Sequence, residues 1–236
     1  MTLQVENLSG GYGQTTVIQN INFTIPAGSV TALIGLNGSG KSTIINHLIG
    51  LLAPKTGSVV LNSHNLAQDP VGFKKQIAYV PEQPVLYEEL NLQEHIQAMI
   101  NIYHLDEKTS WEEATRLLKI FRLDDKLNWF PTHFSKGMRQ KVMIVMAFIT
   151  QADLFIIDEP FLGLDVLAVQ DFLTLIDEKR ESGASLLITT HVMSTLKAHA
   201  DQYIYLEQGQ IVASGAIDAI SDQVPVMLIG EEQTNG

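Results

Sequence analysis

The chain has 236 residues, of which 17% are charged, and its formal net charge is −11 at pH 7. This length is sufficient for one large domain with a subdomain and a well-buried core. The acidic balance argues against a nucleic-acid-binding protein, since such proteins usually carry a basic surface, and the absence of cysteine excludes disulfides and cysteine-bound zinc.

The sequence contains no recognisable segment for export or membrane insertion. Its first thirty residues lack a basic start followed by an apolar core, and its longest apolar run, 142–149, has eight residues. A membrane-spanning helix needs about 18 apolar residues. We therefore expect a soluble, cytoplasmic protein that reaches a membrane only through a partner.

Several segments have the composition of β-strands. Residues 1–28 and 56–80 alternate as antiparallel strands do, whereas 29–35, 152–158 and 184–191 are continuous apolar runs rich in β-branched residues. Such runs are typical of buried parallel strands. Each run ends in residues suited to chemistry, and ligands of open α/β sheets bind at the carboxyl ends of the strands.

A different pattern occupies the middle of the chain. Residues 91–105 carry apolar side chains at helical spacing, with Asn91 as the predicted N-cap and Glu94 three residues later, and 111–123 repeats the pattern. These helices predict a helical subdomain at roughly 88–150, inserted into the α/β core.

The rest of the chain completes one predicted domain. Residues 203–213 resemble a final hairpin, and 230–236 are expected to form a flexible tail. We expect a single domain over 3–229.

The segment GLNGSGKST, 35–43, follows a predicted strand, precedes a predicted helix and matches the phosphate-loop pattern G-x-x-x-x-G-K-[ST]. Its backbone N–H groups and the helix N-terminus would bind phosphate oxygens. Lys41 would reach the β- and γ-phosphates, Ser42 would ligate Mg²⁺, and Thr43 would contact the α-phosphate. The candidate nucleotide-binding residues of this loop are Gly35, Leu36, Asn37, Gly38, Ser39, Gly40, Lys41, Ser42 and Thr43.

Two carboxylates end the second apolar run, in the segment LFIIDEP. Asp158 could hold the Mg²⁺ water shell while Glu159 polarises the attacking water, although adjacent carboxylates at a strand end are otherwise often a helix N-cap. His191 could hydrogen-bond the γ-phosphate, or it could be a packed structural residue. With Lys41, Glu159 and His191 are the candidate catalytic residues.

A second anion site is predicted at the start of the helix that contains 142–149. If Ser135 caps this helix, the N–H groups of Lys136, Gly137 and Met138 remain free to bind an anion. The phosphate loop already surrounds the phosphates within one chain, so the second site would serve a nucleotide held by another copy. The expected assembly is an ATP-dependent homodimer that encloses two ATP molecules.

The motifs GLNGSGKST, FSKGMRQK, LFIIDEP, FLGLD and TTH occur in the order and spacing of the ATP-binding cassette family, which the chain resembles over roughly 3–222. The resemblance implies an α/β fold, with a RecA-like P-loop NTPase core, an N-terminal antiparallel β subdomain and an inserted α-helical subdomain. The chain looks most like exporter-type subunits of the Ecs type.

The resemblance also implies roles for residues that carry weak signals of their own. Tyr12 resembles the aromatic residue that stacks on adenine, although alone it reads as a turn or surface tyrosine. Asp165 resembles the aspartate that crosses the dimer interface, although an aspartate after Gly-Leu is usually a helix cap. Ser135 and Gly137 match family residues that contact the γ-phosphate.

Two positions depart from the family pattern. The usual Leu-Ser-Gly-Gly-Gln is replaced by residues 134–138, in which Lys136 either adds charge near the phosphate or points to solvent. Glu82 stands where the family has a glutamine, with Gln83 next to it. We expect Glu82 to bind Mg²⁺ and sense the γ-phosphate, and Gln83 is the alternative sensor.

The implied function is an ATP-hydrolysing subunit, with ATP and Mg²⁺ as cofactors, that drives an integral membrane permease in export. Val85, Leu86 and Tyr87 lie where the family receives the membrane partner, although they would also fit an ordinary core. The expected location is the inner face of the cell membrane. The alternative is a soluble ATPase of a non-transport complex, of the iron–sulfur scaffold type, which only the partner distinguishes.

Overall fold

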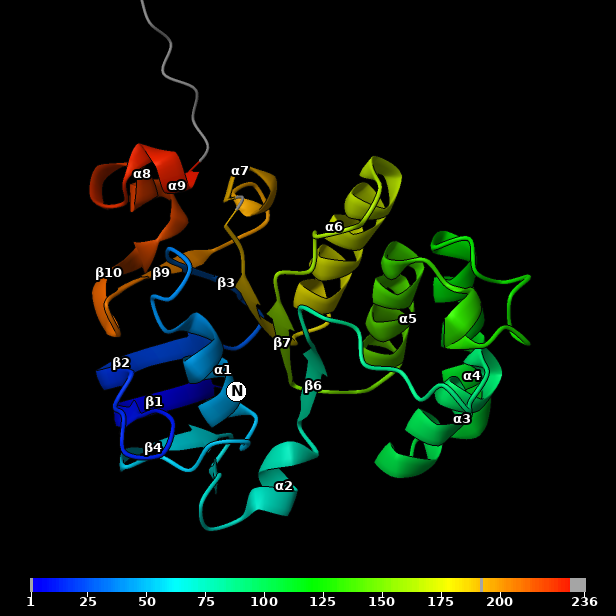
Figure 1. Ribbon diagram of the computed structural model, residues 1–236, viewed down its shortest axis with the longest axis horizontal. Coiled ribbons are helices and arrows are strands. Elements are labelled where there is room, and N and C mark those ends of the chain that lie inside the picture. The colour runs from blue at the N-terminus through cyan, green and yellow to red at the C-terminus, as the bar shows by residue number, and fades with distance from the viewer. Residues whose placement is uncertain (1, 192, 230–236) are drawn as a thin grey trace, which may run out of the picture.

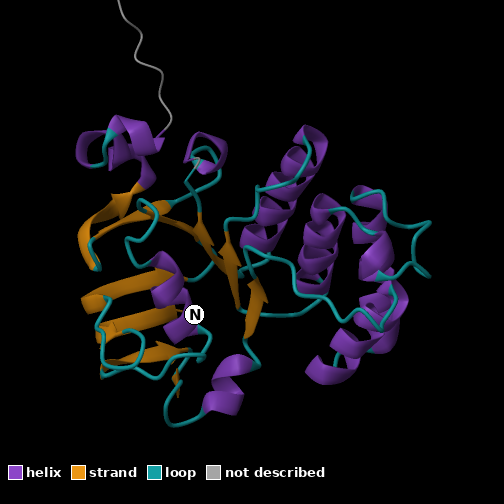
Figure 2. Cartoon of the chain, viewed as in Figure 1, coloured by secondary structure: helices purple, strands orange, loops and turns teal. Residues whose placement is uncertain are grey.

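The computed structural model of the chain describes residues 2–191 and 193–229 (Figure 1). The tail predicted at 230–236 lies outside the described residues. The larger of two sheets runs through the middle of the molecule with helices packed around it, and the smaller sheet lies to the left in Figure 2.

The larger sheet has six strands in the order β10-β9-β3-β8-β7-β6, and all its neighbours are parallel except the β9–β10 pair. The strands are β3 (Val30–Ile34), β6 (Ile77–Val80), β7 (Leu154–Asp158), β8 (Ser185–Thr189), β9 (Gln202–Glu207) and β10 (Gln210–Ala216). Every residue of β3, β7 and β8 is buried. The prediction of three buried parallel strands is therefore confirmed, as is the final hairpin, β9–β10.

The smaller sheet is antiparallel, with the order β2-β1-β4-β5. Its strands are β1 (Thr2–Gly10), β2 (Ile18–Pro26), β4 (Thr56–Leu61) and β5 (His64–Asn65). In β1, Leu3 and Val5 are buried while Gln4 and Glu6 are exposed, which is the alternation expected of a strand with one solvated face.

The second half of segment 56–80 differs from the prediction of antiparallel strands. The Asp69 side chain accepts a hydrogen bond from Gly72 N and caps a short helix, α2 (Pro70–Lys74), whose first residue is a proline. Strand β6 then pairs in parallel with β7 in the larger sheet. The antiparallel prediction is wrong here because short apolar alternation does not specify the partner strand.

Three helices lie within the interval 88–150, to the right of the larger sheet in Figure 1. They are α3 (Leu92–Tyr103), α4 (Glu107–Ile120) and α5 (Lys136–Phe148), with the short 3₁₀ helix η1 (Pro131–His133) before α5. The capping box at Asn91 and Glu94 forms as expected, with reciprocal hydrogen bonds of 2.9 and 2.8 Å. The bounds of the helical subdomain stay a prediction.

The larger sheet contributes to two hydrophobic cores. Val30, Ala32 and Ile34 of β3 face the core shared with α3 to α6, whereas Leu33 faces the core between the two sheets, which also holds α1 (Lys41–Leu48). The remaining helices are α6 (Val166–Glu181), α7 (Met193–Leu196), η2 (Ile217–Ala219), α8 (Ile220–Gln223) and α9 (Val226–Ile229). Within the described ranges, no helix has the length and apolar character to cross a membrane.

Candidate nucleotide-binding site

The loop between β3 and α1 adopts a conformation that requires its glycines. A Cβ added at Gly35 would lie 2.4 Å from the carbonyl oxygen of Leu206, far inside van der Waals contact. Gly40 has a φ of 111° and caps α1 in the left-handed conformation, which other residues rarely adopt. The glycines therefore let the chain turn tightly from a buried strand into a helix whose N-terminus is open to an anion.

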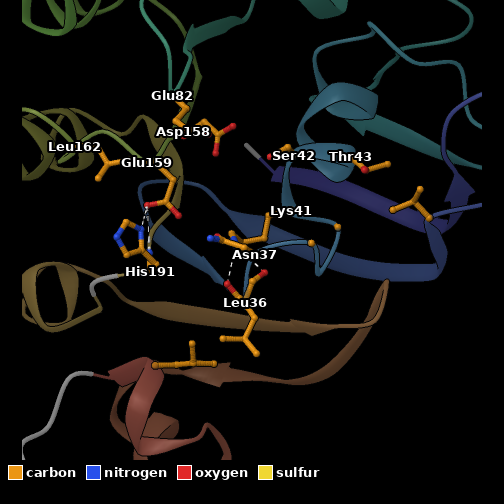
Figure 3. Close-up of a pocket in the computed structure, with 15 residues that line it drawn as sticks. Leu36, Asn37, Lys41, Ser42, Thr43, Glu82, Asp158, Glu159, Leu162 and His191 are labelled. Carbon is orange, nitrogen blue, oxygen red and sulfur yellow. Dashed lines mark hydrogen bonds and ion pairs between the residues drawn. The ribbon is translucent and has the colours of Figure 1, made fainter. Parts of the chain in front are cut away.

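This loop forms one wall of a cavity of about 420 Å³ at the carboxyl ends of the parallel strands (Figure 3). The lining residues are Val17, Gly35, Leu36, Asn37, Gly38, Gly40, Lys41, Ser42, Thr43, Glu82, Asp158, Glu159, Leu162, His191 and Leu228. Most of the predicted nucleotide-binding and catalytic residues are thus brought together. The position of the cavity agrees with the general rule for ligands of open α/β sheets.

Lys41 lies buried in the phosphate loop. Its Nζ donates hydrogen bonds to the carbonyl oxygens of Gly35 at 2.7 Å and Leu36 at 3.3 Å. Burial lowers the pKa of this amine, and the negative charges of the nearby carboxylates Glu159, Asp158 and Glu82 oppose that effect. Two carbonyl oxygens therefore hold the Lys41 side chain inside the loop. A bound phosphate group would replace them as the partner of the amine.

Asp158 is the last residue of β7 and is buried. Burial raises the pKa of its carboxyl, the hydrogen bond from Thr189 opposes this effect, and the charges of Glu82 and Glu159 reinforce it. Thr189 Oγ1 donates that hydrogen bond to Asp158 Oδ1 at 2.5 Å. The strand thus carries an acidic group into a cavity that holds two further carboxylates.

Glu159 and His191 form a hydrogen-bonded pair on one side of the cavity, drawn with dashed lines in Figure 3. Glu159 Oε2 lies 2.8 Å from His191 Nδ1 and accepts a further hydrogen bond from His191 N at 3.2 Å. A carboxylate can only accept, so Nδ1 carries the proton. His191 is half exposed and faces the cavity, so it is not a packed core residue.

The carboxylate pair does not cap a helix. Strand β7 ends at Asp158, and the next helix, α6, begins at Val166 with Asp165 as its N-cap. Asp158 and Glu159 instead point into the cavity, as Figure 3 shows. Of the two alternatives, the arrangement therefore favours a chemical site over a cap.

Three side chains with oxygen atoms line the cavity near the phosphate loop: Ser42, Glu82 and Asp158. Hydroxyl and carboxylate oxygens are the ligands that Mg²⁺ prefers. The residues present therefore fit this ion. Glu82 and Gln83 are both exposed, but only Glu82 lines the cavity, so the geometry favours Glu82 over Gln83 at this edge.

Two of the predicted nucleotide-binding residues in the N-terminal part of the chain lie outside the cavity lining. Tyr12 is 51% exposed, and its hydroxyl accepts a hydrogen bond from Asn46 Nδ2 at 3.0 Å. Ser39 is a buried residue of the phosphate loop, and the described residues offer no hydrogen-bond partner to its Oγ. Ser39 thus belongs to the loop but does not face the cavity.

Ser135 caps α5 as predicted, since its Oγ accepts a hydrogen bond from Met138 N at 3.2 Å. A Cβ at Gly137 would lie 2.3 Å from the carbonyl oxygen of Gly163, so this position needs a glycine. Neither Ser135 nor Gly137 lines the cavity, and Lys136 is exposed. The predicted second anion platform is thus separate from the chain's own phosphate loop.

Asp165 is a helix cap within the single chain. Its Oδ1 accepts a hydrogen bond from Ala168 N at 2.9 Å, and its Oδ2 lies 2.6 Å from Lys141 Nζ. The hydrogen bond from Lys141 is the main cause that lowers the pKa of the carboxyl. Lys141, which the sequence analysis missed, therefore links α5 to the start of α6.

Sequence reasoning also missed Thr189, which bonds both Asp158 and Glu159, and the apolar wall of Val17, Leu162 and Leu228. A hydroxyl residue at the end of an apolar strand was the available signal for Thr189. No local signal marks the apolar wall, because its members come from distant parts of the chain.

Comparison with known proteins identifies this set of motifs. The ABC transporter family model matches residues 18–162. The ABC-type transporter ATP-binding protein EcsA of Bacillus subtilis (strain 168) is 46% identical over 221 residues, covering 94% of this chain and 90% of that protein. The SkfA peptide export ATP-binding protein SkfE of the same strain is 31% identical, covering 97% of each chain.

A solved structure described as the ATP-binding subunit of an ABC transporter is similar to the whole molecule, with a TM-score of 0.91 and 44% identity. It covers 98% of this chain and 96% of its own. The phosphate loop, the paired carboxylates and the histidine therefore occur in a fold that is shared along nearly all of the chain. The chain belongs to the ABC transporter family and is one of its ATP-binding, ATP-hydrolysing subunits.

Proposed function

We propose that the protein binds ATP with Mg²⁺ in this cavity, hydrolyses it as a homodimer, and thereby drives an integral membrane permease in export. The observation that carries the proposal is the convergence of Lys41, Asp158, Glu159 and His191 in one cavity, while the Ser135 platform lies outside it. Such an arrangement is half of a site that a second copy would complete.

In this proposal the phosphate loop binds the triphosphate. Lys41 exchanges its carbonyl partners for β- and γ-phosphate oxygens, and Ser42, Asp158 and Glu82 hold Mg²⁺. The bound Mg²⁺ would neutralise charge that develops on the phosphates. The other residues of the loop surround the phosphates and are Gly35, Leu36, Asn37, Gly38, Ser39, Gly40 and Thr43.

Glu159 is the proposed base that polarises the attacking water. His191 Nδ1–H holds one carboxylate oxygen, which leaves the other free to accept a hydrogen bond from water. The second ring nitrogen of His191 is then available to the γ-phosphate. The 2.8 Å contact thus orients the base and the histidine together.

The second copy would supply the groups missing from this cavity. Ser135 and Gly137 of each copy would contact the γ-phosphate held by the other, Asp165 would cross the interface, and Tyr12 would stack on adenine. ATP closes such a dimer because it makes more contacts in the closed state than in the open one. Hydrolysis removes these contacts and lets the dimer open.

The opening would reach the membrane partner through the loop that follows β6. Val85 and Tyr87 in this loop are 74% and 72% exposed, which suits an apolar docking surface beside Glu82. Export is supported by the name of SkfE, which describes peptide export. The proposed location is the inner face of the cell membrane, reached through the permease.

The docking proposal is tested by affinity purification from detergent-solubilised membranes of the source cells. We expect the tagged chain to retain an integral membrane protein, and Tyr87→Glu to reduce the retained amount at least tenfold, because a charge at an apolar contact must be desolvated. Ile102→Glu is the matched control, since Ile102 in α3 is also an exposed apolar residue, at 69%, but lies outside the loop. Equal retention by both variants would overturn the docking assignment.

A further inference from the structure

Thr189 is a polar residue at the carboxyl end of a central strand of the larger sheet. It is the last residue of β8, its exposed fraction is 0%, and it pairs in register with Asp158 of the neighbouring strand β7. A buried hydroxyl group costs free energy unless it is hydrogen-bonded. Its partners therefore decide what the residue does.

The hydroxyl of Thr189 makes two hydrogen bonds with opposite roles. It donates to Asp158 Oδ1 at 2.5 Å and accepts from the backbone N–H of Glu159 at 2.9 Å. The N–H group of Glu159 can only donate, so the single hydrogen of the hydroxyl goes to Asp158. One side chain thus connects the two adjacent carboxylate residues of the cavity.

The backbone at Glu159 has an unusual conformation, with a φ of 46°. A residue other than glycine rarely adopts this left-handed region, and it persists only where surrounding contacts hold it. The hydrogen bond from Glu159 N to Thr189 is such a contact. It fixes the turn that directs the Glu159 side chain back to His191, 2.8 Å away.

The contact with Asp158 is one-sided. Thr189 donates its hydrogen bond to Oδ1 of Asp158. The second carboxylate oxygen, Oδ2, is therefore available to bind a cation. A hydrogen bond from an outer residue that orients a carboxylate ligand commonly affects metal affinity or activity about 10- to 100-fold. The same hydroxyl therefore acts on the candidate metal ligand and on the candidate base.

We propose that Thr189 is a positioning residue for ATP hydrolysis, whose hydroxyl orients Asp158 for Mg²⁺ and holds the backbone turn that aims Glu159. The inference rests on the proposed roles of Asp158 and Glu159. It goes beyond them because Thr189 does not line the cavity. Its effect reaches the nucleotide only through its two neighbours.

The chain offers a matched control for the burial of a threonine. Thr31 lies in β3 of the same sheet, is also 0% exposed, and its Oγ1 has no hydrogen-bond partner among the described residues. Thr31→Val and Thr189→Val make the same nearly isosteric change. They differ in whether hydrogen bonds are lost.

The experiment compares Thr189→Val, Thr189→Ser and Thr31→Val in the full-length protein. For Thr189→Val we expect kcat to fall about 10- to 100-fold with KM for ATP within about twofold, because the phosphate loop that would bind ATP itself is unchanged. We also expect a smaller rise in melting temperature when Mg²⁺ is added to the ATP-bound protein. Thr189→Ser should restore both quantities, and Thr31→Val should match the wild type in both.

Normal kcat and a normal Mg²⁺-dependent melting shift in Thr189→Val would overturn the inference, as would losses equal to those of Thr31→Val. If Thr189→Val does not fold, Thr189→Ala removes the same hydroxyl and carries the test. Glu159→Gln and Asp158→Asn are measured in parallel. If either is fully active, the proposed roles of these carboxylates fail; if both are inactive and Thr189→Val is not, only this inference fails.

Discussion

Asp158, a proposed ligand of Mg²⁺, lowers the stability of the folded protein. Its carboxyl is buried beside Glu82 and Glu159, and burial with these like charges holds its pKa above the usual value, against the hydrogen bond from Thr189. The unfolded chain does not carry this penalty. The group is therefore retained at a cost in stability that a bound cation would offset.

The sign of the pH effect follows from this shift. Between the unfolded pKa of Asp158, 3.8, and its higher folded value, the folded protein binds more protons than the unfolded chain. The free energy of unfolding therefore falls as pH rises through this window, and the full penalty is present above it.

We expect Asp158→Asn to raise the free energy of unfolding of the nucleotide-free protein by about 1 kcal/mol at pH 8, because the amide carries no charge yet still accepts the Thr189 hydrogen bond. The difference from wild type should shrink towards pH 4, while Mg²⁺-dependent ATP hydrolysis is lost. Urea unfolding at the two pH values measures this. Asp124→Asn, at an exposed aspartate, is the control; a variant less stable than wild type at pH 8 contradicts the argument.

At the scale of elements, the loop from β6 (Ile77–Val80) to α3 places two consecutive residues, Glu82 and Gln83, differently with respect to the cavity. Glu82 lines the cavity, whereas Gln83 does not. The carbonyl of Pro81 accepts a hydrogen bond from Gln140 Nε2 at 3.4 Å, and this contact ties the start of the loop to α5. The loop thus carries both a cavity residue, Glu82, and the exposed residue Tyr87.

We predict that Glu82→Ala lowers the rate of ATP hydrolysis at least tenfold, because a carboxylate near the proposed Mg²⁺ position is lost. Gln83→Ala should stay within about twofold of wild type. Phosphate release at saturating ATP and Mg²⁺ distinguishes the two residues. The reverse result would assign the sensing role to Gln83.

The contacts of some elements can be predicted from the sequence, and those of others cannot. The capping box of α3 was predicted because Asn91 and Glu94 are three residues apart, and local spacing alone determines the contact. The pairing of β6 with β7 was not predicted, because the two strands are more than seventy residues apart and short apolar segments accept several partners.

At the scale of the whole molecule, the larger sheet positions the site. The strands β3, β7 and β8 are adjacent and parallel, so the phosphate loop, the carboxylates and His191 meet at one edge. Ser135, at the start of α5, is kept outside this cavity. The arrangement predicts that two inactive chains can restore each other.

We predict that Lys41→Ala and Ser135→Asp are each inactive alone, and that an equal mixture recovers roughly a quarter of wild-type ATP hydrolysis. Half of the dimers are then mixed, and each has one intact site of two. Aspartate at 135 still caps α5 but repels a phosphate, so folding is preserved. Activity in Ser135→Asp alone, or no recovery on mixing, would count against the shared sites.

The sequence by itself determined the phosphate loop, the paired carboxylates, the capping of α5 and the position of the three buried strands β3, β7 and β8. Each of these depends on residues within a few positions of one another, where backbone geometry and burial leave little freedom. Only the tertiary structure showed the hydrogen bonds of Thr189 and Lys141 and placed Glu82, not Gln83, in the cavity lining. These depend on strand register and on helix contacts across the core, because hydrogen bonds act over about 3 Å whatever the separation along the chain.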